Sequence, residues 1–166
     1  NSNKNFLFIN SGFNFRPTDI QSAIGLSQFK SLNNFINIRK INRNKIIKKL
    51  TTDKRWDHQV CFVEKNSNVK PSWFGLSMLI NKKFKHSKKL IFNRLDKLGI
   101  ENRPIISGNF LKQPALRKYN ISQKSKDFSN ANHIHEYGLH VGLKNEIMSR
   151  IETEKFANIF FKSFTF

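Results

Sequence analysis

The chain has 166 residues, a formal net charge of +19 at pH 7 and one cysteine, Cys61. This length suffices for one ordinary domain with a core, and 38% hydrophobic residues, among them 17 phenylalanines, exclude an intrinsically disordered chain. A lone cysteine excludes an internal disulfide framework and favours a reducing, cytoplasmic location, and no apolar run reaches the roughly 18 residues that a membrane span requires.

The positive charge has two interpretations. Lysine and arginine side chains release counterions when they neutralise phosphates, so a basic module that binds nucleic acid is one hypothesis for the function. The other is compositional bias, because Lys, Asn, Ile and Phe are all over-used and the charge is spread along the whole chain. No RNA-binding aromatic motif or zinc-finger spacing accompanies the charge. The charge alone therefore decides little, and nucleic-acid binding is kept as the alternative function.

The chain opens on a segment that is typical of the interior of a longer protein. It begins with Asn1 and lacks the basic region, apolar core and cleavage site of a signal peptide. The apolar run Phe6–Ile9 then predicts a short buried strand. We therefore expect a fragment whose first element belongs to a larger fold.

A long helix is predicted from Thr18 to Leu50. Thr18 is a good N-cap, and Gln21 three residues later completes a capping box. The segment "SLNN" at 31–34 predicts a kink or a break. Unbroken, this helix would be about 50 Å long, more than a domain of this size needs, which indicates packing against something outside its own domain.

Asn14 and Arg16 precede that helix. In an extended segment they lie on one face, opposite Phe13 and Phe15. Arginine can donate two hydrogen bonds to a phosphate, an asparagine amide can add one, and the positive end of the helix points to the same place. The alternative is that Arg16 is solvated and Asn14 supports a turn, which the residues alone favour.

The rest of the chain alternates strand-like and helix-like segments. Gly99 is typical of a helix end, and Pro104 restricts the strand around it to an edge or an end. Strands separated by helices predict an α/β or α+β sandwich. Strands are expected at 59–64, 73–80, 100–107 and 139–142, and helices at 86–98, 131–138 and 144–164, with a turn and short helix at 108–116.

Arg103, Asn109 and Gln113 form a second candidate group. If a helical turn opens after Gly108, Asn109 and Gln113 are i,i+4 neighbours on one face. With Arg103 they could supply hydrogen bonds to sugar hydroxyl groups and one charge for a diphosphate. The alternative is that these residues only punctuate a loop. Trp73 is interpreted as a core residue or a pocket wall.

His133, His135 and His140 invite a metal hypothesis, which we reject. Residues i and i+2 of a helix do not face each other, and no cysteine pair accompanies them. Cys61 lies beside Val60 and is more typical of a core residue than of a nucleophile. No metal site is expected.

Several segments resemble one known family. The stretch "GFNFRPTDIQSAIGLSQFK" is similar to the motif G-Y-N-Y-R-M-T-D-I-Q-A-A-I-G-L of the DegT/DnrJ/StrS family. "SWFGLSMLI", "LGIENRP", "SGNFLKQPAL" and "ANHIHEYGLHVG" follow in the family's order. Phe13, Phe15 and Pro17 replace residues that are more common there. The segment "SGNFLKQP" most resembles the branch that removes the 3-hydroxyl from nucleotide-linked 4-keto-6-deoxyhexoses.

The resemblance implies a fold and a division of the chain. It implies the C-terminal portion of a fold-type I transferase that depends on vitamin B6, with a small mixed sheet covered by helices. Residues 1–17 would end the large domain and reach across to another subunit. Residues 18–50 would form the long connecting helix, and 51–166 the small C-terminal α/β domain.

The resemblance also implies a function. The full-length enzyme would use pyridoxal or pyridoxamine 5′-phosphate on nucleotide-linked sugars, by transamination or 3-dehydration, in deoxysugar, aminosugar or surface-polysaccharide biosynthesis. The catalytic Lys or His is expected upstream of Asn1, so this chain alone would be inactive. In a homodimer with shared active sites, Asn14 and Arg16 would bind the partner's cofactor phosphate. The residues implied near the nucleotide-sugar are Trp73, Arg103, Asn109, Gln113 and His140.

Overall fold

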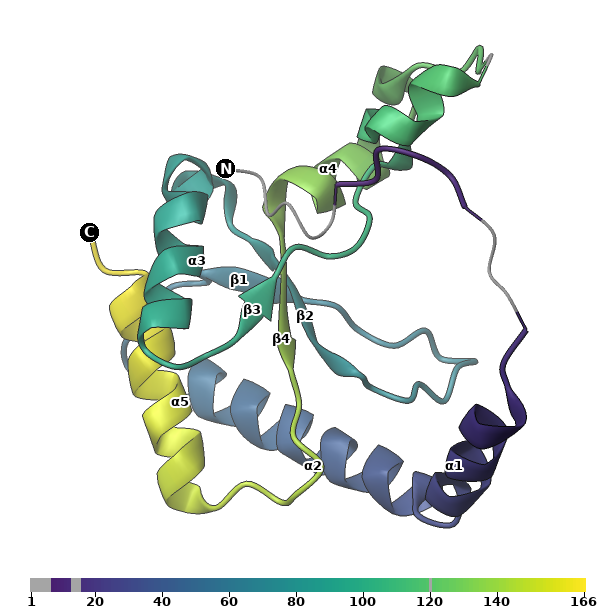
Figure 1. Ribbon diagram of the computed structural model, residues 1–166. Helices are drawn as coiled ribbons and strands as arrows, with labels where there is room; N and C mark the ends of the chain where they lie inside the picture. The colour runs from purple at the N-terminus through teal and green to yellow at the C-terminus, as the bar shows by residue number, and fades with distance from the viewer. Residues whose placement is uncertain (1–6, 13–15, 120) are drawn as a thin grey trace.

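The computed structural model describes residues 7–12, 16–119 and 121–166, and their centre is an antiparallel sheet (Figure 1). The strands lie in the order β1-β2-β4-β3, and each neighbouring pair is antiparallel. The expected mixed sheet is therefore corrected, because the loop after β1 brings β2 back beside it in the opposite direction. The strands are β1 (Val60–Phe62), β2 (Gly75–Ile80), β3 (Asn102–Arg103) and β4 (Gly138–Gly142).

Three helices pack on one face of this sheet, and a fourth leads directly into β4. The core joins residues of α2, α3 and α5 to the strands, and α4 contacts β2 and β4 (Figure 1). This confirms the expected arrangement of a small sheet covered by helices. The α-helices are α1 (Asp19–Phe29), α2 (Leu32–Thr51), α3 (Lys88–Lys97), α4 (Ser129–Tyr137) and α5 (Arg150–Ser163). The 3₁₀ turns are η2 (Lys82–Ser87), η3 (Phe110–Lys112), η4 (Pro114–Lys118) and η5 (Ser125–Asp127).

The core depends on the alternation of side chains along the two central strands. Leu76 and Met78 of β2 and Leu139 of β4 are all completely buried against the helices. The residues between them in sequence, such as Ser77 and His140, are only half-buried on the other face. A sheet with one covered face shows this two-residue period, and its second face is left available for other contacts.

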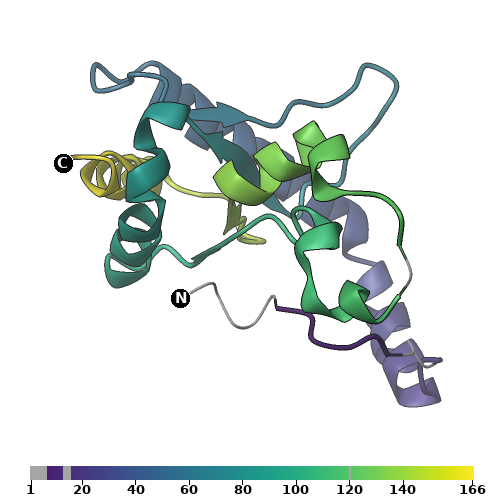
Figure 2. The same ribbon diagram turned by 90° about the horizontal axis from the view of Figure 1, so that it is seen from above.

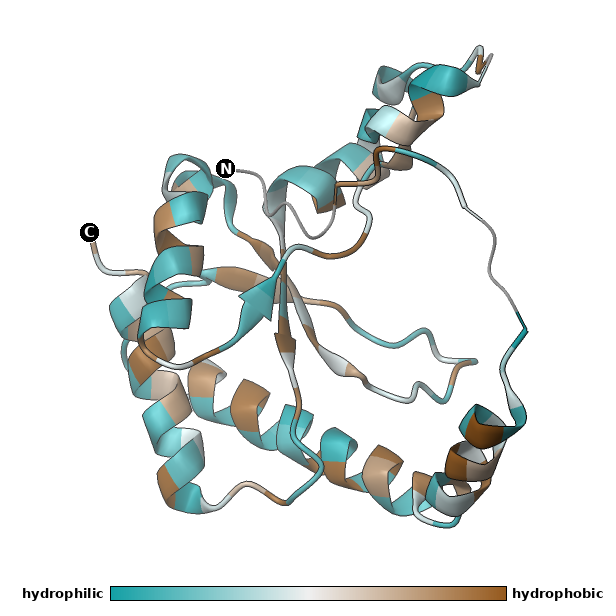
Figure 3. Ribbon diagram, in the orientation of Figure 1, coloured by the Kyte–Doolittle hydropathy of each residue, from teal (hydrophilic) through white to brown (hydrophobic). Residues whose placement is uncertain are grey.

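The long N-terminal helix is broken where the sequence predicted a break. α1 ends at Phe29 and α2 begins at Leu32. The capping box is confirmed, since the backbone N–H of Gln21 donates to Thr18 Oγ1 (3.4 Å) and Gln21 Oε1 accepts from the N–H of Thr18 (2.8 Å). α1 contains no buried residue and projects from the body (Figure 2). Hydrophobic residues recur along this helix (Figure 3), and several of them are exposed, for example Ile20 at 75%.

The opening segment does not form the predicted strand in its described part. Residues 7–9 contact the 3₁₀ turns instead of the sheet. The N–H of Phe8 donates to Gln113 Oε1 (3.1 Å), and the N–H of Ala115 donates to the carbonyl of Phe8 (2.8 Å). Phe6 lies outside the described residues. The prediction of a short buried strand is therefore wrong for the described residues 7–9, which are exposed and whose backbone partners come from an irregular loop.

The last helix starts later than expected. α5 begins at Arg150 because Ser149 caps it, with the N–H of Glu152 donating to Ser149 Oγ (3.1 Å). The preceding loop is attached to α2 by Asn42, which is completely buried. Its Nδ2 donates to the carbonyl of Lys144 (3.2 Å) and to that of Glu146 (2.7 Å), and its Oδ1 accepts from the N–H of Met148 (2.8 Å).

Two other expectations near the sheet are confirmed. α3 is closed as predicted by Gly99, which follows the C-cap residue Leu98 and whose φ of +87° is the left-handed conformation typical of that position. β3 is an edge strand that stops immediately before Pro104.

Within the described residues, none of the helices combines the length and the hydropathy needed to cross a membrane.

Replacing Asn42 with alanine should destabilise the fold by about 3 kcal/mol, because buried backbone groups of the loop lose their partners. The measurement is urea unfolding followed by circular dichroism. Asn44→Ala is the matched control, since Asn44 lies on the exposed side of the same helix and its loss should change stability by less than about 0.5 kcal/mol. Equal stability of the two variants would contradict the anchoring role of Asn42.

Candidate functional site

The uncovered face of the sheet carries a compact group of polar and aromatic side chains, called here the open-face cluster: Phe74, Ser77, Arg103 and His140. Adjacent strands bring its members together. β2 and β4 pair Ser77 with His140, and β3 and β4 pair Arg103 with the same His140. The strand register therefore places Arg103 and His140, which the family resemblance implied near the same ligand, next to each other.

Aromatic stacking and one hydrogen bond hold the open-face cluster together. The imidazole of His140 stacks on the ring of Phe74, with centroids 6.0 Å apart and planes inclined by 16°. The guanidinium of Arg103 lies 5.3 Å from the centre of the same ring. Ser77 Oγ and His140 Nδ1 are 2.9 Å apart and share a hydrogen bond. Phe74 thus contacts both the guanidinium and the imidazole while remaining 64% exposed itself.

His140 is held neutral in this position. Burial lowers its pKa below the ordinary value, and the neighbouring charge of Arg103 lowers it further. Its Nε2 is buried and has no hydrogen-bond partner among the described residues. The ring fits only because residue 75 is glycine, since a Cβ there would lie 2.3 Å from Nε2. Because the imidazole is neutral, it adds no second fixed positive charge to that of Arg103. The guanidinium of Arg103 can bind an anionic, oxygen-rich ligand.

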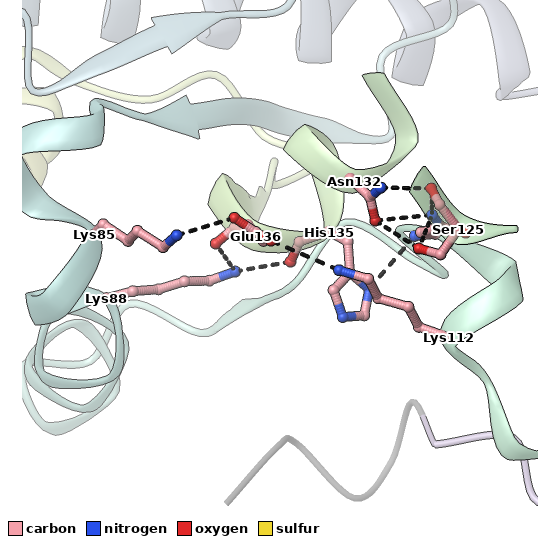
Figure 4. Close-up of polar contacts among 8 residues, drawn as sticks. Lys85, Lys88, Lys112, Ser125, Asn132, His135 and Glu136 are labelled. Carbon is pink, nitrogen blue, oxygen red and sulfur yellow. Dashed lines mark hydrogen bonds and ion pairs between the residues drawn. The ribbon is translucent and has the colours of Figure 1, made fainter. Parts of the chain in front are cut away.

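Asn109 and Gln113 lie elsewhere and hold loops together. They flank the 3₁₀ turn η3 instead of sharing one face of an α-helix, so the expected i,i+4 geometry is corrected. Asn109 Nδ2 donates to Asn132 Oδ1 (2.9 Å) and to Ser125 Oγ (3.0 Å). Ser125 and Asn132 also bond each other, forming one network (Figure 4). Gln113 Nε2 donates to the carbonyl of Ser107 (3.3 Å). A substrate role for these two amides stays a prediction.

Trp73 belongs to a different part of the structure. It packs against the core, and the guanidinium of Arg43 lies 4.1 Å above its ring. Arg43 Nη2 also donates to the carbonyl of Val63 (2.7 Å), which ties α2 to the loop after β1. This geometry favours the core interpretation of Trp73, and its substrate role stays a prediction.

Of the two residues predicted to bind a phosphate, Asn14 lies outside the described residues. Arg16 is described and exposed, three residues before the first residue of α1. It therefore lies beside the positive end of a capped helix of 11 residues.

The three histidines of the rejected metal hypothesis have separate surroundings. His133 packs on the ring of Tyr137 (4.7 Å), and His135 faces the loop after β3, where its Nδ1 accepts from the N–H of Asn109 (3.4 Å). His140 belongs to the open-face cluster.

Cys61 is exposed, so its interpretation as a core residue is wrong. The reason is that its side chain points to the uncovered face of the edge strand β1.

The sequence did not single out Phe74 or Ser77. One signal for Ser77 was present, because a polar residue interrupts the hydrophobic strand 75–80 just as His140 interrupts 138–142. Two polar interruptions in strands that become neighbours indicate a shared polar position on the uncovered face. For Phe74 no comparable signal exists, because an aromatic residue at a strand start is equally typical of a core.

Replacing Arg103 with glutamine should raise the pKa of His140, because the repelling positive charge is removed. The pKa should stay below the ordinary value of histidine, since burial of the ring remains. Histidine NMR signals followed against pH measure this change. Arg150→Gln is the matched control, because it removes an exposed arginine at the start of α5. An unchanged pKa of His140 in the Arg103 variant would contradict the electrostatic coupling.

Three comparisons relate the chain to known proteins. It is 35% identical over 139 residues to the GDP-4-keto-6-deoxy-D-mannose 3-dehydratase of Escherichia coli O55:H7, covering 84% of this chain and 34% of that protein. The structure of the E. coli enzyme with bound hydrated PLP superimposes with a TM-score of 0.69 at 30% identity, over 95% of this chain and 39% of that one. A mutant of the 3-dehydratase with bound GDP-perosamine gives 0.71 at 28%, over 93% and 38%.

The chain thus spans about a third of the length of the curated relatives that it matches. A separate comparison with protein families gives a match, in which residues 1–159 fit the sequence pattern of the family. The resemblance in the motifs and the expected fold-type I portion are both confirmed. The chain belongs to the DegT/DnrJ/EryC1/StrS aminotransferase family.

Proposed function

We propose that this chain is the C-terminal part of an enzyme that uses pyridoxal or pyridoxamine 5′-phosphate to act on nucleotide-linked 4-keto-6-deoxy sugars. The observation that carries this proposal is the 35% identity to a 3-dehydratase of such a sugar over 84% of the chain. The expected reactions are 3-dehydration or transamination, in the biosynthesis of deoxysugars or surface polysaccharides. The group that bonds covalently to the coenzyme is expected outside this chain.

The described residues fit the phosphate of such a coenzyme at one place. Arg16 is exposed beside the N-terminus of α1, so its guanidinium can donate two hydrogen bonds to a phosphate while the helix end adds positive potential. Arg16 and, by the family motif, Asn14 would hold this phosphate. When bound, the coenzyme supplies an electron sink that allows a bond next to the sugar's 4-keto carbon to break.

The open-face cluster supplies the groups that would orient the nucleotide-sugar. Arg103 would bind a phosphate of the nucleotide, and the half-buried imidazole of His140 would form the wall beside it, because its Nδ1 is bonded to Ser77 and its Nε2 is buried. Phe74 keeps the guanidinium and the imidazole at fixed positions by contacting both. This arrangement binds and orients the substrate.

A second copy of the protein is expected to complete the site. The exposed apolar side chains of α1 support a homodimer or packing against the rest of the longer protein, because burying one of them contributes about 1.5–3 kcal/mol. In the homodimer, Arg16 would bind the coenzyme held by the other subunit. The lone cysteine supports a cytoplasmic location.

In the full-length protein that contains this chain, Arg16→Ala should weaken coenzyme retention about tenfold or more, because a charge-assisted contact to phosphate is lost. Retention is measured by the absorbance of the bound coenzyme after dialysis, which needs no turnover. Circular dichroism should be unchanged, since Arg16 is exposed.

Lys30→Ala is the matched control, because it removes an exposed cation at the opposite end of α1. Its coenzyme retention should equal that of the unmodified protein. Equal retention in the Arg16 and Lys30 variants would contradict the role of Arg16. A full-length protein that binds no coenzyme at all would contradict the proposed function itself.

A further inference from the structure

A cavity of about 960 Å³ opens between α3, the loop that follows β3 and the C-terminal end of α4. This volume is in the range of small-ligand sites. Part of its lining is apolar and includes Leu7, Phe92 and Ile106. The opposite part is basic, and three of its members carry the argument: Lys88, Lys112 and His135. None of these three side chains has a role in the function proposed above.

Lys88 is the most enclosed of the three. Its Nζ donates to the carbonyls of His135 (3.2 Å) and Glu136 (2.8 Å), at the negative C-terminal end of α4 (Figure 4). Burial lowers the pKa of this ammonium to about 8, although the charge of Glu136 opposes the change. An ammonium has three donors, so one remains after the two carbonyl contacts. Nearby negative charge would offset the cost of burying Lys88.

The acidic groups around the cavity only partly neutralise its lysines. Glu136 Oε1 lies 3.6 Å from Lys112 Nζ, and its Oε2 lies 3.2 Å from Lys85 Nζ. Asp96, at the other end of the cavity, accepts from Asn102 Nδ2 (2.7 Å). Four lysines (Lys85, Lys88, Lys89 and Lys112) and His86 line the cavity together with Asp96, and Glu136 pairs with Lys85 and Lys112 beside it. The wall therefore keeps an excess of positive charge.

His135 is prepared to donate a hydrogen bond. Its Nδ1 accepts from the N–H of Asn109, so the proton of the neutral ring is on Nε2. The ring points away from α4 into the open space (Figure 4), and it lines the cavity. Burial lowers its pKa, and the charges of Lys112 and Lys88 lower it further, while a hydrogen-bonding interaction with the backbone of Ser107 and the charge of Glu136 oppose them. Gly108, with φ of +65°, allows the close approach of this ring, since a Cβ there would lie 2.6 Å from Nδ1.

We propose that this cavity binds the phosphoryl group of a small phosphorylated molecule. Lys112 and the remaining donor of Lys88 would supply charge, and Nε2–H of His135 would donate one hydrogen bond. The apolar lining would receive the rest of the ligand. The site takes a small molecule and not a nucleic acid, because it is a cavity between helices and a loop, whereas a continuous strand requires an open basic groove with stacking aromatic residues.

This site is argued from the described residues of this chain and not from the proposed function, although it shares Gln113 with the residues that the family resemblance implies near the nucleotide-sugar. Its test therefore uses the full chain without coenzyme. The probes are inorganic phosphate, pyrophosphate and GDP, which separate the phosphoryl group from the nucleoside. Histidine NMR signals, assigned with His135→Gln, are followed against pH with and without each probe.

Bound phosphate should raise the pKa of His135, because an anion stabilises the imidazolium. All three probes should give this increase, and pyrophosphate should bind more tightly than phosphate. Tighter binding of GDP than of pyrophosphate would show that the site also recognises the nucleoside. Equal binding would show that it recognises the phosphoryl group alone. An unchanged pKa of His135 at saturating concentrations of every probe would overturn the proposal.

Lys112→Met should weaken pyrophosphate binding about tenfold, since it removes the charge but keeps most of the stem. Lys40→Met is the matched control, because Lys40 is an exposed lysine of α2 and its loss lowers the net charge equally. Equal weakening in both variants would assign the binding to the overall charge and overturn the site. Binding of an oligonucleotide without any effect of GDP on His135 would also overturn it.

Discussion

The antiparallel register of β4 between β2 and β3 is the constraint on which both the core and the candidate site depend. Because side chains alternate along β4, Leu139 and Val141 enter the core while His140 lies on the opposite face. A shift of one residue would bury the imidazole and expose two core residues. The large free energy of burying the apolar face therefore also fixes His140 beside Ser77. The geometry of the site is a consequence of the packing behind it.

Elements with a strong local signal could be predicted from the sequence. The capping box of Thr18, the break before Leu32 and the end of α3 at Gly99 are set by neighbouring residues, and all three were found. The start of α5 was placed too early, although the capping-box pattern of Ser149 and Glu152 marks it locally. The local sequence could not show how the loop before the helix is held, because that depends on Asn42, more than 100 residues earlier. Long-range contacts of this kind leave no periodic pattern.

The candidate site was predictable only in part, for a related reason. The family resemblance implied Arg103 and His140 near the same nucleotide-sugar, but the sequence does not display the sheet register that makes them neighbours. Asn109 and Gln113 were grouped by an assumed α-helical spacing. The 3₁₀ turn between them directs their amides to different loops. Residue type indicated the hydrogen-bonding capacity of these amides correctly, but their partners depended on backbone geometry.

The large net charge is a poor guide to function because the effect of a charge depends on its surroundings. Lys40 is exposed and strongly screened by water and salt, whereas Lys88 is enclosed against the end of α4 and its pKa is lowered to about 8. The two residues contribute equally to the total of +19. Of these two residues, only Lys88 lies beside the cavity, where a bound anion would stabilise its charged form. Enclosure, and not the number of lysines, gives a basic protein a specific anion site.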